Sequence, residues 1–284
     1  KMNVHKRWSG FLFLLPSLLG VTAFFVLPFL KSLYYTFTQG VIHPKFVGIK
    51  NFQELLANTV FRQAAGNTLF FLILAVPLQM IIAIFLSLVL SKRPFRWQRW
   101  ALLLPMVIPV SSLALAWQGL WGQEGVVSRG LALLGVSESN LLYGPSAFPL
   151  LITLYLLKNT GYLTIIISSA MTALPPEYGE SFRLDCSSEL SFVRSIVVPL
   201  ISPTLIFSAV VAVMNYFLMF RDIYMLYGDN PPSSVYMLQH FMNRNFYELN
   251  YQRLSAAAFL TILGMTVLII ASLALQRRAI RRVG

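Results

Sequence analysis

Six apolar segments, each long enough to cross a lipid bilayer, dominate this 284-residue chain. A hydrocarbon core of about 30 Å is spanned by roughly 20 helical residues. The segments that meet this length run approximately over residues 10–37, 67–90, 100–121, 149–171, 203–227 and 254–275. Because a backbone in lipid must satisfy its own hydrogen bonds, such segments form helices. The sequence therefore predicts an all-α polytopic membrane protein with six transmembrane helices, folded as one domain over residues 1–284.

Composition agrees with a membrane protein and argues against several other classes. Charged residues make up 11% of the chain, whereas soluble domains carry about 25%. The net charge is +12, but the basic residues cluster in short segments between apolar runs, so a nucleic-acid partner is not expected. The single cysteine excludes a disulfide framework, and the three histidines lie too far apart in the sequence to predict a metal site.

The distribution of lysine and arginine predicts the orientation. Thirteen of them lie in residues 1–7, 92–99, 183–194 and 277–282, in the segments on one side of the membrane. The segments on the other side hold five, namely Lys45, Lys50, Arg62, Arg129 and Arg244. Since positively charged loops stay in the cytoplasm, both termini are expected there.

The first two apolar segments contain prolines. Pro16 and Pro28 interrupt the first segment and Pro77 the second, and a membrane helix accommodates proline as a kink. We therefore expect bends at these residues and not helix ends. Residues 1–20 also imitate a signal peptide, but the apolar run continues to Phe37 without a small-residue cleavage site, so an uncleaved first span is expected.

Motifs of catalysis and of energy conversion are missing from the chain. It contains no G-x-x-x-x-G-K-[ST] phosphate loop, no H-E-x-x-H and no G-x-S-x-G. Asp222 is almost the only carboxylate within the spans, which gives little support to a proton relay. We expect a non-catalytic chain without a cofactor of its own. A stand-alone secondary carrier or channel and a membrane-embedded enzyme are the alternatives.

Residues 174–200, between the fourth and fifth spans, predict two short amphipathic helices on the cytoplasmic side. Two prolines open the first helix, and Glu177 and Glu180 suit its positive end. Tyr178 and Phe182 are four residues apart and share one face. On the residues alone, helices that merely lie on the bilayer surface explain this pattern equally well.

The same segment resembles the signature loop of importer permeases in the ATP-binding-cassette superfamily, E-A-A-x-x-D-G-A followed by F-x-x-I-x-L-P-x-x-x-P. Glu180 and Asp185 occupy the two acidic positions, Ile196 the isoleucine, and Pro199 and Pro203 the two prolines, with the spacing preserved. The alanines, the Gly-Ala pair and the phenylalanine are replaced.

The resemblance extends over nearly the whole chain. The start, from Trp8 through the first span, and residues 220–232 after the fifth span are similar to the sugar-permease branch. The chain looks most like the first of two paired permeases of the maltose-type family. This resemblance implies a multi-pass protein of the bacterial inner membrane that forms half of the pathway for a carbohydrate.

The family's partners and coupling mechanism follow from this resemblance. A second homologous permease would complete the pathway, two ATPase subunits would bind ATP and Mg, and an extracytoplasmic solute-binding protein would deliver the solute. Residues 175–185 would form the coupling helix that docks on an ATPase subunit. The residues assigned to this contact are Tyr178, Glu180, Phe182, Arg183 and Asp185. Asp185 is expected mainly to cap the second short helix.

The residues expected to contact solute are Lys158, Asn215, Tyr216 and Phe220. An unpaired charge in mid-span costs at least ~2.5–3.5 kcal/mol, so Lys158 should face solute or a carboxylate. A salt bridge from Lys158 to the partner permease is an equal alternative, and Arg221 with Asp222 is expected to form a gate or a structural pair. Aromatic and amide side chains suit a sugar, although packing also explains the aromatics. Lys158 and Arg221 leave room for an acidic oligosaccharide, such as a uronate.

Overall fold

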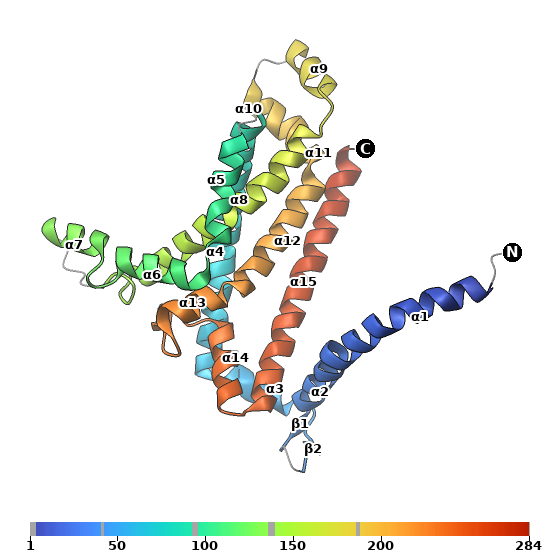
Figure 1. Ribbon diagram of the computed structural model, residues 1–284, viewed down its shortest axis with the longest axis vertical. Helices are drawn as coiled ribbons and strands as arrows, with labels where there is room; N and C mark the ends of the chain where they lie inside the picture. Colours follow the sequence, from blue (N-terminus) through green and yellow to red (C-terminus); the bar gives the residue numbers. More distant parts are fainter. Residues whose placement is uncertain (1–3, 41–42, 93–95, 136–139, 186–187, 284) are drawn as a thin grey trace. The chain divides into compact units, whose positions relative to one another are not determined.

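The structure is a computed structural model and describes residues 4–40, 43–92, 96–135, 140–185 and 188–283. As the apolar segments predict, these residues are almost entirely helical (Figure 1). The strands among them form one short hairpin of β1 (Thr38–Gln39) and β2 (Lys45–Phe46). The helices are α1 (Val4–Val21), the π-helix η1 (Thr22–Val26), α2 (Leu27–Thr36), α3 (Lys50–Ala57), α4 (Thr59–Lys92), α5 (Arg96–Val107), α6 (Val110–Trp121), α7 (Val126–Leu133), α8 (Ala147–Thr172), α9 (Glu177–Asp185), α10 (Glu189–Phe192), the π-helix η2 (Val193–Val197), α11 (Val198–Leu200), α12 (Ser202–Leu218), α13 (Phe220–Tyr227), the 3-10 helix η3 (Ser233–Val235), α14 (Leu238–Tyr247) and α15 (Tyr251–Val283).

Within the described residues, 5 helical segments are long and apolar enough to cross a membrane. They are Phe13–Thr36, Thr59–Ser91, Ala147–Thr172, Ser202–Tyr227 and Tyr251–Ala274. These segments correspond to the first, second, fourth, fifth and sixth expected spans. The second begins earlier than expected because its helix includes polar turns around Arg62 that precede the apolar run.

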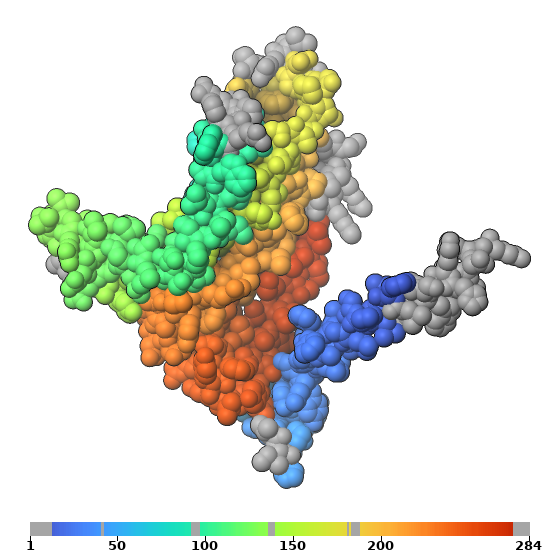
Figure 2. All heavy atoms as spheres, in the orientation of Figure 1, coloured from blue at the N-terminus to red at the C-terminus, as the bar shows by residue number. Residues whose placement is uncertain are grey.

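The third expected span, residues 100–121, is not one continuous helix. α5 ends at Val107 and α6 begins at Val110, and the segments Trp97–Val107 and Val110–Leu133 are bent by 92° at this break. Pro109 lies at this break with an extended ψ of 142°, and a proline disfavours a helical conformation at the residue before it. In the space-filling view, α6 and α7 project from the other helices of the segment that contains them (Figure 2). The expectation of a single helix here is wrong because both halves are apolar and hydropathy does not register the break.

The other helices continue through their prolines, as expected. Pro16 and Pro77 lie inside α1 and α4. Just before Pro28 the helix widens into the π turn η1, in which the N–H of Leu27 donates to the carbonyl five residues earlier. The second π turn, η2, lies just before Pro199. A wider turn relieves the contact between a proline ring and the carbonyl four residues before it.

The chain divides into two compact units. Unit 1 comprises residues 1–62 and 241–264, and unit 2 comprises residues 63–240 and 265–284. Within unit 1, the side-chain amide of Asn51 donates to the carbonyl oxygens of Thr36 and Thr38, at 2.9 and 3.0 Å. These bonds fix the start of α3 against the end of α2 and the first strand.

Unit 2 is built around α8, in which 61% of the most apolar stretch is buried. α5 and α12 run beside it (Figure 1), and α4 contacts it through side-chain hydrogen bonds. The hydroxyl of Tyr155 on α8 lies 2.6 Å from the side-chain oxygen of Gln79 on α4. Further along α8, a Cβ at Gly161 would overlap the carbonyl oxygen of Leu102 on α5. Glycine is therefore required for the close approach of these two helices.

Candidate functional site

An ion pair lies inside unit 2 between α8 and α13. The Nζ of Lys158 is 2.6 Å from Oδ1 of Asp222, and the two side chains are 15% and 5% exposed. A charge in an apolar segment requires such a partner. The carboxylate that neutralises Lys158 thus belongs to the same chain as Lys158. The alternative, a salt bridge from Lys158 to the partner permease, is wrong. The adjacent Arg221 is not the partner of Asp222.

A cavity of about 270 Å³ adjoins this ion pair, and we call it the charged cavity. Its lining residues are Met106, Val110, Lys158, Asn159, Asn215, Leu218, Met219, Arg221 and Asp222. Met106 and Val110 stand on the two sides of the break between α5 and α6. The bend that hydropathy does not register therefore forms one wall of the cavity.

The structure brings together only two of the four residues expected to contact solute. Lys158 and Asn215 line the charged cavity, whereas Tyr216 is 1% exposed, with its hydroxyl 3.2 Å from Oγ1 of Thr68. The ring of Phe220 packs 5.1 Å from that of His240. Neither aromatic residue is among those that line the cavity.

Helical spacing explains this outcome. Asn215, Met219 and Asp222 follow one another at intervals of four and three residues and so share one face. Tyr216 lies about 100° further round the helix and points into the core. This periodicity is present in the sequence. Asn215, Tyr216 and Phe220 were expected to form one site because they are close along the chain, and that criterion ignores the face of the helix on which each residue lies.

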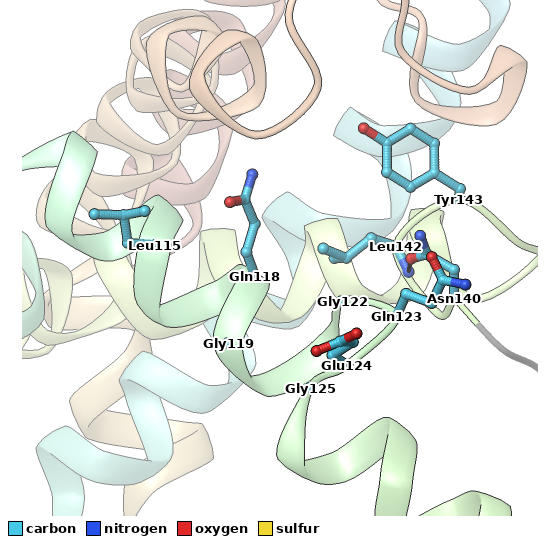
Figure 3. A pocket seen from close by; sticks show the side chains of 10 residues that line it. All are labelled: Leu115, Gln118, Gly119, Gly122, Gln123, Glu124, Gly125, Asn140, Leu142 and Tyr143. Atoms are coloured by element: carbon cyan, nitrogen blue, oxygen red, sulfur yellow. Dashed lines mark hydrogen bonds between the residues drawn. The ribbon is translucent and has the colours of Figure 1, made fainter.

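A second cavity, of about 480 Å³, lies beside the second half of α6 and the turn that follows it (Figure 3). We call it the polar cavity. Its lining residues are Leu115, Gln118, Gly119, Gly122, Gln123, Glu124, Gly125, Asn140, Leu142 and Tyr143. Figure 3 shows Gln118 on α6, with Asn140 and Tyr143 on the segment before α8. The amide of Gln118 donates to the carbonyl of Leu226, which links α6 to α13.

His240, at the start of α14, is a buried ionisable group outside the apolar spans. Its side chain is 3% exposed, and its Nδ1 accepts a hydrogen bond of 3.3 Å from the N–H of Met237. Burial lowers the pKa of His240 to about 4, although the negative charge of Asp229 acts in the opposite direction. The imidazole is therefore neutral at physiological pH.

The segment between the fourth and fifth spans forms two short helices, α9 and α10, as expected. The N–H of Gly179 donates to the carbonyl of Pro176 at 2.9 Å, in the first turn of α9. The residue that caps α10 is Ser188, whose hydroxyl accepts from the N–H of Ser191. The expectation that Asp185 is this cap is wrong, because α9 continues through Asp185 and α10 starts only at Glu189.

The residues assigned to coupling differ in exposure. Tyr178 is 46% exposed, and Glu180 is also exposed. Phe182 is partly buried, with its ring 5.5 Å from the ring of Phe192 on α10. Arg183 and Asp185 lie in α9, and their side chains are outside the part of the chain that the structure describes. We call the two helices α9 and α10 together the α9–α10 hairpin.

Comparison with known proteins identifies the family. A family model described as the binding-protein-dependent transport system inner membrane component matches residues 61–284. The chain belongs to this family. It is an integral membrane permease, and the resemblance to importer permeases inferred from the signature loop is confirmed.

Individual relatives match most of the permease. It is 25% identical over 279 residues to the trehalose/maltose transport system permease protein MalF of Thermococcus litoralis, covering 94% of both chains. It is also 25% identical to the probable ABC transporter permease protein YesP of Bacillus subtilis, over 92% of the permease and 89% of the relative. A solved bacterial ABC transporter involved in the import of the acidic polysaccharide alginate superposes with a TM-score of 0.80, at 22% identity and 97% coverage of both chains. At this identity the likeness shows the fold.

Proposed function

We propose that this permease forms half of the translocation pathway of an ATP-driven, binding-protein-dependent importer of carbohydrate. The observation that carries the proposal is the α9–α10 hairpin between the fourth and fifth spans, which leaves Tyr178 and Glu180 exposed. Relatives named as sugar permeases, among them the MalF protein, support the choice of a carbohydrate. A second permease, two ATPase subunits that bind ATP and Mg, and a solute-binding protein complete the proposed assembly.

The exposed side chains of the hairpin provide the docking surface in this proposal. A few buried anchors dominate most protein interfaces, and aromatic side chains are frequent among them. Tyr178, half exposed on the first helix, is such an anchor. Glu180 and Arg183 supply polar contacts from the same helix, and Asp185 lies at its end.

Co-purification of the assembled transporter tests this role. Tyr178→Ala is expected to reduce the amount of ATPase subunit retained on the tagged permease several-fold, without reducing membrane insertion. Leu133→Ala is the matched control, because this apolar side chain is 90% exposed on α7, outside the hairpin. A lone permease that transports solute without any ATPase would contradict the proposal and favour a stand-alone carrier.

The proposed topology has six spans with both termini in the cytoplasm, and counts α5 with α6 as a broken third span. The only cysteine of the sequence, Cys186, directly follows Asp185, the last residue of α9, and serves as a natural label. An impermeant maleimide should label Cys186 in inside-out vesicles and not in intact spheroplasts. In a Cys186→Ser background, Ser233→Cys should show the reverse pattern. Labelling of Cys186 from outside would overturn the orientation.

A further inference from the structure

We propose that the charged cavity binds the carboxylate of an acidic sugar through Arg221 and Asn215. The inference rests on the proposed function and adds the chemical class of the solute. It assigns Lys158 to the structure of the cavity wall, not to the solute.

The charges that line the cavity do not balance. Lys158 and Arg221 are cationic, and Asp222 is the one acidic residue among the lining residues. Since Asp222 is bound to Lys158 at 2.6 Å, the positive charge of Arg221 is left over. In the part of the chain that the structure describes, no acidic side chain forms an ion pair with Arg221.

An uncompensated guanidinium on a membrane span does not face lipid. Its cost in hydrocarbon places such a group toward a water-filled pathway or a partner of opposite charge. Arg221 is exposed in this chain and lines a cavity, which agrees with a place on the pathway. A guanidinium binds a carboxylate with paired, charge-assisted hydrogen bonds, and this geometry is specific to planar anions.

Asn215 supplies a second donor without an acceptor. Its Nδ2 is buried, and no hydrogen-bond partner is found for it within the described residues. Buried polar groups are nearly always hydrogen-bonded, so this amide indicates an absent acceptor. Together, Arg221 and Asn215 call for a ligand that is rich in acceptors and negatively charged. The hydroxyls of a neutral sugar would satisfy the amide but leave the charge of Arg221 uncompensated.

The polar cavity provides a contrast within the same unit. Its lining includes the carboxylate of Glu124 and no lysine or arginine, so it does not attract an anion. The charged cavity, at about 270 Å³, lies just below the range of about 300–1,000 Å³ typical of small-molecule sites. This volume suits a single sugar unit, so that an oligosaccharide would pass through it one unit at a time.

Equilibrium binding to the assembled transporter tests the proposal. The complex of both permeases and the ATPase subunits is placed in nanodiscs without the solute-binding protein, and binding of radiolabelled trigalacturonate and maltotriose is measured. The wild type should bind trigalacturonate roughly ten-fold more tightly than maltotriose. Both Arg221→Gln and Asn215→Asp should abolish this preference, the first by removing the cation and the second by adding a carboxylate of the same shape. Arg129→Gln, an exposed arginine outside the cavity, is the control.

The outcomes separate this inference from the proposed function. Equal binding of the two sugars, or tighter binding of maltotriose, would overturn the acidic site while leaving a carbohydrate importer in place. Loss of the second permease from the Arg221→Gln complex would also overturn it, because Arg221 would then be a subunit contact. If neither sugar binds and neither stimulates ATP hydrolysis with the solute-binding protein present, the carbohydrate function itself fails.

Discussion

The charged cavity and the α9–α10 hairpin both carry ionisable side chains, but the exposure of these side chains differs between the two regions. Asp222 is 5% exposed and is neutralised by Lys158, whereas Glu180 on the hairpin is exposed and Tyr178 is 46% exposed. A buried charge must be compensated within the chain, so its loss is felt in folding. An exposed group adds little to stability and remains available to another molecule. The comparison predicts large stability effects in the cavity and small ones in the hairpin, where assembly should be affected instead.

The largest effect is expected for Asp222→Ala. Removing one partner of a buried pair leaves Lys158 uncompensated, and this should lower the free energy of unfolding by about 3–5 kcal/mol. Denaturant unfolding of the detergent-purified permease measures the change. Glu124→Ala is the matched control, since its ion pair with Arg129 at 3.2 Å is exposed and should contribute less than about 1 kcal/mol. Similar losses in the two variants would erase the distinction between buried and exposed charge.

A pH-dependent loss of stability is expected from His240. The pKa of His240 is lowered to about 4 by burial, so the unfolded chain binds a proton more readily than the folded one. The contribution of the neutral His240 to the free energy of unfolding is therefore fully present above pH 6.5. It is lost as the pH falls toward 4, by about 3 kcal/mol in total. Unfolding midpoints between pH 7 and pH 4 should show this loss.

Two variants isolate the contribution of His240. His240→Gln should flatten the pH profile, whereas His43→Gln, at an exposed histidine, should leave it unchanged. A profile that keeps its slope in the His240→Gln variant would assign the pH dependence to other groups.

A smaller effect is expected for Gly161→Ala, which tests the packing beside the charged cavity. The added methyl would meet the backbone of Leu102, and overpacking of this kind costs about 1–3 kcal/mol. Gly264→Ala is the control because a methyl group added there would meet nothing within 4 Å, and alanine favours a helix over glycine by up to about 1 kcal/mol. Equal melting temperatures for the two variants would contradict the close approach of α5 and α8.

Most of the helical architecture could be predicted from the sequence, because hydropathy in lipid leaves few alternatives to a helix. The break at Pro109 could not, since the two segments that it separates are together apolar enough for one membrane span. Proline alone does not decide the matter, because α1 and α4 continue through Pro16 and Pro77. What differs at Pro109 is the backbone geometry that tertiary packing selects.

The site was only partly predictable, for a related reason. A lysine in mid-span can be predicted to need a partner, but the sequence grouped Asp222 with its neighbour Arg221, whereas the structure pairs it with Lys158. Their pairing depends on how α8 meets α13, which no local pattern encodes. The same holds for Phe182, which the helical spacing places beside Tyr178 but which the structure packs against Phe192.

The smallest effect on stability is expected in the hairpin, where Phe182→Ala and Phe192→Ala remove the two halves of one ring contact. Such a pair contributes about 0.5–1.5 kcal/mol beyond its buried area. Unfolding should therefore change little in the Phe182→Ala variant and more in the Phe192→Ala variant, because Phe192 also packs against a buried core cluster, while retention of the ATPase subunit falls in both. If Phe182 only fixes the shape of the hairpin, the two variants should reduce retention equally. If Phe182 also contacts the ATPase, its variant should reduce retention further. Full retention of the ATPase subunit in both variants would mean that α9 needs neither ring to dock. The assignment of the hairpin to assembly would then depend on Tyr178 and Glu180 alone.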